Sequence, residues 1–188
     1  MILVFHKPYG VLSQYKPSGE KRTLLEFPAL SGGKAVGRLD EDSEGLLVIS
    51  ELPWVQTLLT TPGRVEKTYW AQVERLPETE ALQQLRQGVR CGDFTSAPAQ
   101  ARLLPDLQIP PRNPPIRHRL NVPTAWLELQ LREGKNRQVR RMTAAVGHPT
   151  LRLLRAAIGP IQLGALAAGE CRELTRPERE WLNRLGRR

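Results

Sequence analysis

The stretch Gly37-Arg38-Leu39-Asp40-Glu41-Asp42-Ser43-Glu44-Gly45-Leu46-Leu47-Val48 places Asp40 on a turn between two apolar segments. The apolar run that follows Gly45 is typical of a buried strand, so residues 37–45 are predicted to connect two strands. Gly37 and Gly45 can adopt backbone angles that other residues avoid, which permits a tight turn and close approach by a ligand. These residues alone allow two interpretations: a solvated acidic loop, which is the commoner case, or a carboxylate held in a fixed, exposed position.

Length and composition indicate one basic globular domain. The 188 residues are 40% hydrophobic and carry a formal net charge of +9, which suits a substantial core and an anionic partner such as nucleic acid or a membrane surface. Cys91 and Cys171 are too few and too far apart for a disulfide framework or a zinc knuckle, so we expect a reducing compartment and no metal site. No signal peptide and no apolar run of about 18 residues is evident. We therefore expect a soluble cytoplasmic protein.

Short strands alternate irregularly with amphipathic helices along the chain, and no internal repeat is evident. A capping box at Thr175 and Glu178 predicts the start of a terminal helix. Gly88 would end a helix that contains Leu82 and Leu85. Strands are predicted at residues 1–5, 67–73 and 124–131, and helices at 23–30, 52–59 and 176–185.

Two segments concentrate positive charge. Residues 132–155 contain seven Lys or Arg residues and the single acid Glu133, and a helix beginning near Asn136 would place its arginines and its apolar residues on different faces. Residues 105–123 are rich in proline, which favours an extended path, and they contain Arg112, Arg117 and Arg119. The first segment is either a solvated helical face or a phosphate-binding site, and the second is either a linker or an RNA-contacting loop.

Signatures of several common enzyme classes are missing. The sequence has no glycine-lysine phosphate-binding loop, no dinucleotide-binding glycine fingerprint and no His-Glu-x-x-His zinc helix. What remains is a basic protein with one well-presented aspartate and no cofactor signature.

Three motifs occur in an order and at a spacing that resemble a known protein family. Gly37-Arg38-Leu39-Asp40 with Gly45-Leu46-Leu47, then Lys67-Thr68-Tyr69, then the segment Gly134 to Met142 (GKNRQVRRM) resemble, in order and spacing, the small-subunit type family of bacterial pseudouridine synthases. His6-Lys7-Pro8-Tyr9-Gly10 looks like the family's amino-terminal Lys-Pro-x-Gly element. Residues 111–117 are similar to a segment of a large-subunit ribosomal RNA pseudouridine synthase. The resemblance covers nearly the whole chain.

The resemblance implies an α+β fold with a mixed, mostly antiparallel central sheet, flanking helices and two lobes around a basic cleft. We expect residues 1–188 to form one catalytic domain of two sub-lobes, without the separate amino-terminal S4 RNA-binding domain that many relatives carry. We also expect a monomer.

The implied reaction isomerises one uridine of 23S ribosomal RNA to pseudouridine, with no cofactor. Asp40 would attack C1′ or C6, or remove the C2′ proton, and these three routes stay open. An arginine would hold the carboxylate ionised and oriented, and Arg140 is preferred to Arg137 because it matches the family's Gln-x-Arg position. Tyr69 would lie against the uracil, and Leu154 or Leu151 would pack on its other face.

Flipping a uridine out of folded RNA costs a few kcal/mol, so stacking and phosphate contacts must hold it. Candidates for substrate binding are Lys7, Arg38, Lys67, Lys135 and Arg137. Two other classes of function remain: an RNA-binding or ribosome assembly factor that performs no chemistry, and a nucleoside hydrolase or glycosylase that releases the base.

Overall fold

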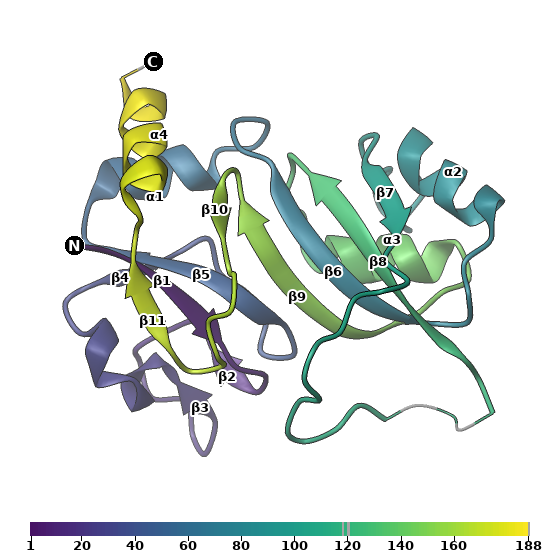
Figure 1. Cartoon of the computed structure of the whole chain (residues 1–188), viewed down its shortest axis with the longest axis horizontal. Coiled ribbons are helices and arrows are strands. Elements are labelled where there is room, and N and C mark those ends of the chain that lie inside the picture. The colour runs from purple at the N-terminus through teal and green to yellow at the C-terminus, as the bar shows by residue number, and fades with distance from the viewer. Residues whose placement is uncertain (118, 120, 188) are drawn as a thin grey trace. The chain divides into compact units, whose positions relative to one another are not determined.

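The computed structural model describes residues 1–117, 119 and 121–187 (Figure 1). The chain forms two compact units, the first made of Met1–Lys67 and Arg155–Arg188 and the second of Thr68–Leu154. The divisions fall at the start of strand β6 (Lys67–Glu74) and inside strand β9 (Thr150–Ile158). The described residues contain four α-helices, and their strand pairs are mostly antiparallel. This confirms the predicted α+β class.

The first unit is built around strand β5 (Glu44–Ser50), whose residues are all buried. β1 (Ile2–Lys7) and β4 (Lys34–Val36) both pair with β5 in antiparallel register and both place a residue opposite Val48, so they lie on its two edges. β11 (Cys171–Glu173) pairs with the other edge of β1, and β10 (Ile161–Gln162) forms a hairpin with the end of β9. β2 (Val11–Leu12) and β3 (Arg22–Thr23) form a separate parallel pair.

Alternation along β5 divides the core of the first unit into two clusters. Leu46 and Val48 pack with residues of α1 (Pro53–Thr60) and α4 (Arg176–Gly186). Leu47 and Ile49 pack in the second cluster, with Leu24 and Leu30. Because both faces of β5 are covered, the strand tolerates a continuous apolar run, as the sequence predicts.

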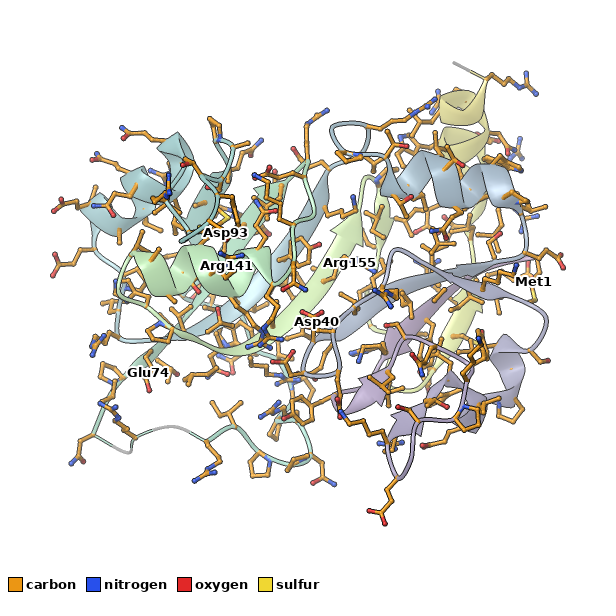
Figure 2. The ribbon with its side chains drawn as sticks, turned by 180° about the vertical axis from the view of Figure 1, so that it is seen from behind. Met1, Asp40, Glu74, Asp93, Arg141 and Arg155 are labelled. Carbon is orange, nitrogen blue, oxygen red and sulfur yellow. The ribbon has the colours of Figure 1, made fainter. Side chains whose placement is uncertain are left out.

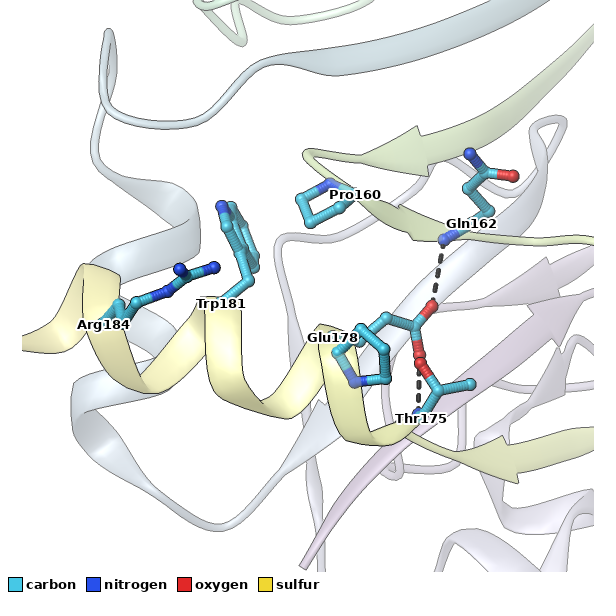
Figure 3. Close-up of a pocket in the computed structure, with 7 residues that line it drawn as sticks. Pro160, Gln162, Thr175, Glu178, Trp181 and Arg184 are labelled. Carbon is cyan, nitrogen blue, oxygen red and sulfur yellow. Dashed lines mark hydrogen bonds between the residues drawn. The ribbon is translucent and has the colours of Figure 1, made fainter.

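Two details of the helices in the first unit bear on the predictions. The helix predicted at residues 23–30 is instead two 3₁₀ turns, Leu24–Glu26 and Pro28–Leu30, because Pro28 has no N–H and cannot continue an α-helix. The capping box of α4 is confirmed: the Thr175 N–H donates to Glu178 Oε2 at 2.8 Å (Figure 3). The pKa of the Glu178 carboxyl, although raised by burial, falls to about 2 because Arg172 and Thr175 donate hydrogen bonds to it.

The second unit contains β6, β8 (Thr124–Leu131) and β7 (Gln100–Leu103), adjacent in that order. α2 (Thr79–Gln87) ends at Gly88, which has a positive φ of 96°, as the sequence predicts. α3 (Gln138–Ala145) begins two residues later than the predicted start near Asn136. Buried residues of these elements form a third core cluster that includes Leu85, Leu129 and Met142.

Residues 104–123, which connect β7 to β8, contain no helix or strand among those that the structure describes. His118 and Leu120 lie outside the described residues. Arg152 anchors this connection by donating to the carbonyl oxygen of Pro110 at 2.7 Å. No helix in the described part of the chain is long and apolar enough to cross a membrane.

Candidate active site

Asp40 lies in the connection between β4 and β5, where it is partly exposed (Figure 2). The connection turns sharply at Asp40, whose carbonyl oxygen accepts a hydrogen bond from the Ser43 N–H at 3.1 Å. Gly37 and Gly45, which bound the connection, have φ values of +67° and +99°. Both glycines therefore have the positive φ values expected from the sequence, and Asp40 lies on a tight turn.

Ser13 holds the residue before Asp40. Its hydroxyl donates to the Leu39 carbonyl oxygen at 2.7 Å and accepts from the Leu39 N–H at 3.1 Å, and both residues are buried. Both backbone groups of Leu39 are thus satisfied by one side chain. No motif or periodicity predicts this role, because Ser13 follows a short apolar segment and belongs to none of the recognised motifs.

Lys7 holds the residue after Asp40. Its ammonium group donates to the carbonyl oxygens of Val11 at 2.6 Å and Pro8 at 2.8 Å, with Glu41 O at 3.5 Å. The Gly10 N–H also donates to Glu41 O, at 2.8 Å. The sequence suggested Lys7 for the surface that contacts phosphates, whereas the structure buries it completely. Its neighbouring carbonyls explain the burial, since they replace the water that the ammonium group would lose.

The environment of Lys7 also changes its protonation. Burial lowers the pKa of Lys7 to about 8, although the nearby carboxylates of Glu44, Asp42 and Asp40 raise it. The acidic residues of the connection are therefore close enough to act on this buried cation.

Arg155 holds both ends of the connection. Its Nε donates to Leu46 O at 2.8 Å and its Nη2 donates to Gly37 O at 2.9 Å, and the residue is only 3% exposed. Figure 2 shows Arg155 on β9. In the sequence, this arginine is only one residue of the basic segment 132–155, and no pattern predicts that it contacts the Asp40 turn.

Lys67 is also buried, at the start of β6. Burial lowers its pKa, and the positive charge of Arg155 lowers it further. Arg38, by contrast, is exposed. The described part of the first unit thus contains three predicted substrate-binding residues, of which Lys7 and Lys67 are buried and Arg38 is exposed.

The other predicted site residues belong to the second unit. Tyr69 lies on β6, where its partly buried ring packs on that unit's core. Arg140 lies in the first turns of α3 and donates to the Thr150 carbonyl oxygen at 3.3 Å. Leu154 is buried and Leu151 is partly buried, both on β9. The pairing of Asp40 with Arg140 or Arg137, and the packing of Leu154 or Leu151 on the base, stay predictions.

The basic motif of residues 134–142 contacts the segment 91–97. The Lys135 ammonium donates to Thr95 O at 3.1 Å and lies 4.4 Å from the centre of the Phe94 ring. Arg141 lies over the same ring at 4.5 Å and pairs with Asp93. These contacts hold two cations of the motif in place.

Arg137 immediately precedes α3 and is exposed. Its φ of 49° is left-handed, so it lies outside the helix and not on the helical face that the sequence suggested. The turn therefore presents Arg137 separately from Arg140.

Comparison with known proteins gives a consistent result. Residues 1–145 match the family described as RNA pseudouridylate synthase. A ribosomal large subunit pseudouridine synthase E of Xanthomonas axonopodis pv. citri is 55% identical over 171 residues, which are 89% of this chain and 90% of that protein. The synthase E of Vibrio vulnificus is 45% identical, over 94% of this chain and 76% of that protein.

The fold agrees with these relationships. A crystal structure of a pseudouridylate synthase superimposes with a TM-score of 0.78 at 26% identity, covering 96% of this chain and 73% of that one. Residues 1–145, which match the family, include the turn that carries Asp40 and the Lys67-Thr68-Tyr69 strand. The chain belongs to the RNA pseudouridylate synthase family.

Proposed function

We propose that the protein isomerises a specific uridine of 23S ribosomal RNA to pseudouridine and that Asp40 is the reacting group. The N1–C1′ bond breaks, a C5–C1′ bond forms, and the proton on C5 is replaced by one on N1, so the product has the composition of the substrate. The observation that carries the proposal is the Asp40 turn itself, whose backbone is held by Ser13, Lys7 and Arg155. A reacting carboxylate needs such a support, because small errors in position are costly.

The steps assigned to Asp40 all need an ionised carboxylate. It would attack C1′ or C6 of the uridine, or remove the C2′ proton. Arg140 is the proposed partner that keeps Asp40 ionised and oriented, with Arg137 as the alternative. Tyr69 would stack on the uracil and take the C5 proton, and Leu154 would pack on the other face of the ring.

Substrate binding would rest mainly on phosphate contacts, which supply most of the affinity of proteins for RNA. The net charge of +9 supports this. Arg38, Lys135 and Arg137 are exposed and suit phosphates directly. The buried Lys7 and Lys67 would not contact phosphates. Lys7 would contribute through its hydrogen bonds to backbone carbonyls, and both lysines through their positive charge near the site. The similarity to synthase E of Xanthomonas and Vibrio supports large-subunit RNA as the substrate.

We further propose that the enzyme works as a monomer in the bacterial cytoplasm, with residues 1–188 serving as a single catalytic domain and with no cofactor. The chemistry supports the last point, because an isomerisation needs neither an oxidant nor a group donor.

The test is Asp40→Asn, which keeps the size of the side chain and removes its charge. We expect pseudouridine formation in a 23S RNA fragment to be abolished, while RNA affinity stays within about threefold of the wild type, because phosphate contacts dominate affinity. Asp42→Asn removes the same charge two residues away and should retain turnover. Full activity of Asp40→Asn would refute the assignment, and release of free uracil by the wild type would indicate a glycosylase.

Mapping of pseudouridines in ribosomal RNA from cells with and without the protein separates the enzyme from an assembly factor. Loss of one modified site is expected, and that site is the target. An assembly defect with every pseudouridine intact would favour the assembly factor.

A further inference from the structure

Arg155 joins the two ends of the segment that carries Asp40. One guanidinium group donates to Gly37 O, which follows β4, and to Leu46 O, which lies in β5. The two acceptors stand on either side of Asp40 in the sequence. The distance between the ends of the connection is thereby fixed by one rigid, planar group.

The backbone at Arg155 is as closely fitted as its side chain. A Cβ atom placed on Gly45 would lie 2.5 Å from the Arg155 carbonyl oxygen and 2.8 Å from its N atom. Only glycine permits this approach. Arg155 therefore contacts the connection and the start of β5 through its own backbone and through two nitrogen atoms of its side chain.

Burial of this arginine carries a desolvation cost. The two acceptors are neutral carbonyls, and the neighbouring Lys67 is a second buried cation whose pKa is lowered by burial and then by Arg155. Placing two like charges in a buried region is unfavourable, and an apolar side chain would avoid that cost. What an apolar residue cannot supply is the pair of hydrogen bonds across the connection.

We propose that Arg155 is a positioning residue for the isomerisation: it holds the ends of the Asp40 connection at a fixed separation, so that the carboxylate meets the ribose or the base in a reactive geometry. The inference rests on the proposed function of Asp40. Displacement of a reacting group by about 1 Å can cost about 100-fold in rate. Loss of the two hydrogen bonds from Arg155 should therefore lower kcat more than it changes KM.

The experiment measures kcat, KM and thermal unfolding for Arg155→Met and Arg155→Lys, with a 23S RNA fragment as substrate. Met has a similar length and donates no hydrogen bond, and we expect kcat to fall about 100-fold with KM within about threefold. Lys keeps the charge but lacks the planar fork, so an intermediate loss of about tenfold in kcat is expected. Lys keeps the test decisive if the Met variant does not fold.

Arg172→Met is the matched control. Arg172 also donates to a backbone carbonyl, Gln162 O at 2.6 Å, and pairs with Glu178, so its loss should lower stability. Its hydrogen-bond partners among the described residues lie on β10, β11 and α4 and not on the Asp40 connection, so kcat below the unfolding temperature should stay at the wild-type value.

The outcomes separate this inference from the proposed function. Folded Arg155 variants with wild-type kcat would overturn it, as would a loss confined to KM, while the wild type stays active and Asp40→Asn stays inactive. A wild type that forms no pseudouridine would instead refute the proposed function.

Discussion

Two connections between strands of this protein differ in the groups that hold them among the described residues. Residues 37–43, between β4 and β5, are held by side chains from three other parts of the first unit: Lys7, Ser13 and Arg155. Residues 104–123, between β7 and β8, are proline-rich and are tied at Pro110 by Arg152 and near their end by the Arg75 N–H, which donates to Pro123 O at 2.7 Å.

The difference matches what each connection would have to do. A carboxylate that reacts must keep one position, which requires a dense set of hydrogen bonds around its backbone. Cations that meet phosphates need exposure and reach, and their energy depends on charge more than on exact placement. Substitutions of the groups that hold the backbone of the first connection should therefore change stability and kcat, and substitutions of the cations in the second should change RNA affinity.

The largest effect is expected for Gly45→Ala. The new Cβ would meet the Arg155 backbone at 2.5 Å, and the φ of +99° is strained for alanine. We expect a loss of about 3 kcal/mol or more in the free energy of unfolding, measured by urea denaturation. Gly164→Ala is the control, because Gly164 has a φ of +62° with nothing within 4 Å. Its cost should be only about 1 kcal/mol, and equal costs at the two positions would contradict the close fit.

Ser13→Ala comes next. Removal of the hydroxyl leaves the buried N–H and C=O of Leu39 without their partner, which should cost about 1–3 kcal/mol and lower kcat. Thr57→Ala removes an exposed hydroxyl that bonds within its own helix, and its effect should stay within about 0.5 kcal/mol. A Ser13 variant with unchanged stability and kcat would break the distinction between the two connections.

The buried Lys7 predicts a pH dependence of stability. Its pKa is about 8 in the folded protein and 10.5 in a model peptide, so between these pH values the unfolded chain binds the extra proton. Stability should consequently rise with pH in this window, by about 1–2 kcal/mol between pH 8 and 9.5, relative to Lys7→Met, which lacks the titrating group. Urea unfolding of both proteins at several pH values measures it, and a constant difference would be inconsistent with the lowered pKa.

The smallest effect on stability is expected in the second connection. Arg117→Ala and Arg119→Ala should each change the free energy of unfolding by less than about 0.5 kcal/mol, because both side chains are exposed. Each should weaken RNA binding and reduce the salt dependence of the affinity by about one counterion. Arg176→Ala on α4 is the control and should leave that salt dependence unchanged. An unaltered salt slope in the loop variants would remove this connection from the RNA-binding surface.

Much of the local structure follows from the sequence because its causes are local. The capping box at Thr175 and Glu178 predicts the start of α4, and the apolar run after Gly45 predicts the buried strand β5. Residues 24–30 form two 3₁₀ turns and not the predicted helix, because Pro28 cannot continue an α-helix. Of the site, the turn and its two glycines were predictable, whereas the burial of Lys7 was not.

The sequence by itself determined the family, the positive charge and the position of Asp40 on a glycine-bounded turn. Only the tertiary structure decided which polar side chains hold that turn. Ser13 bonds a residue 26 positions away, and Arg155 bonds one 118 positions away. Hydrophobic periodicity and turn motifs depend on residues a few positions apart, so they cannot predict hydrogen bonds between residues so distant in the sequence. Which cation is buried and which is exposed likewise depends on packing, because a lysine or arginine looks the same in sequence whether water or carbonyl oxygens surround it.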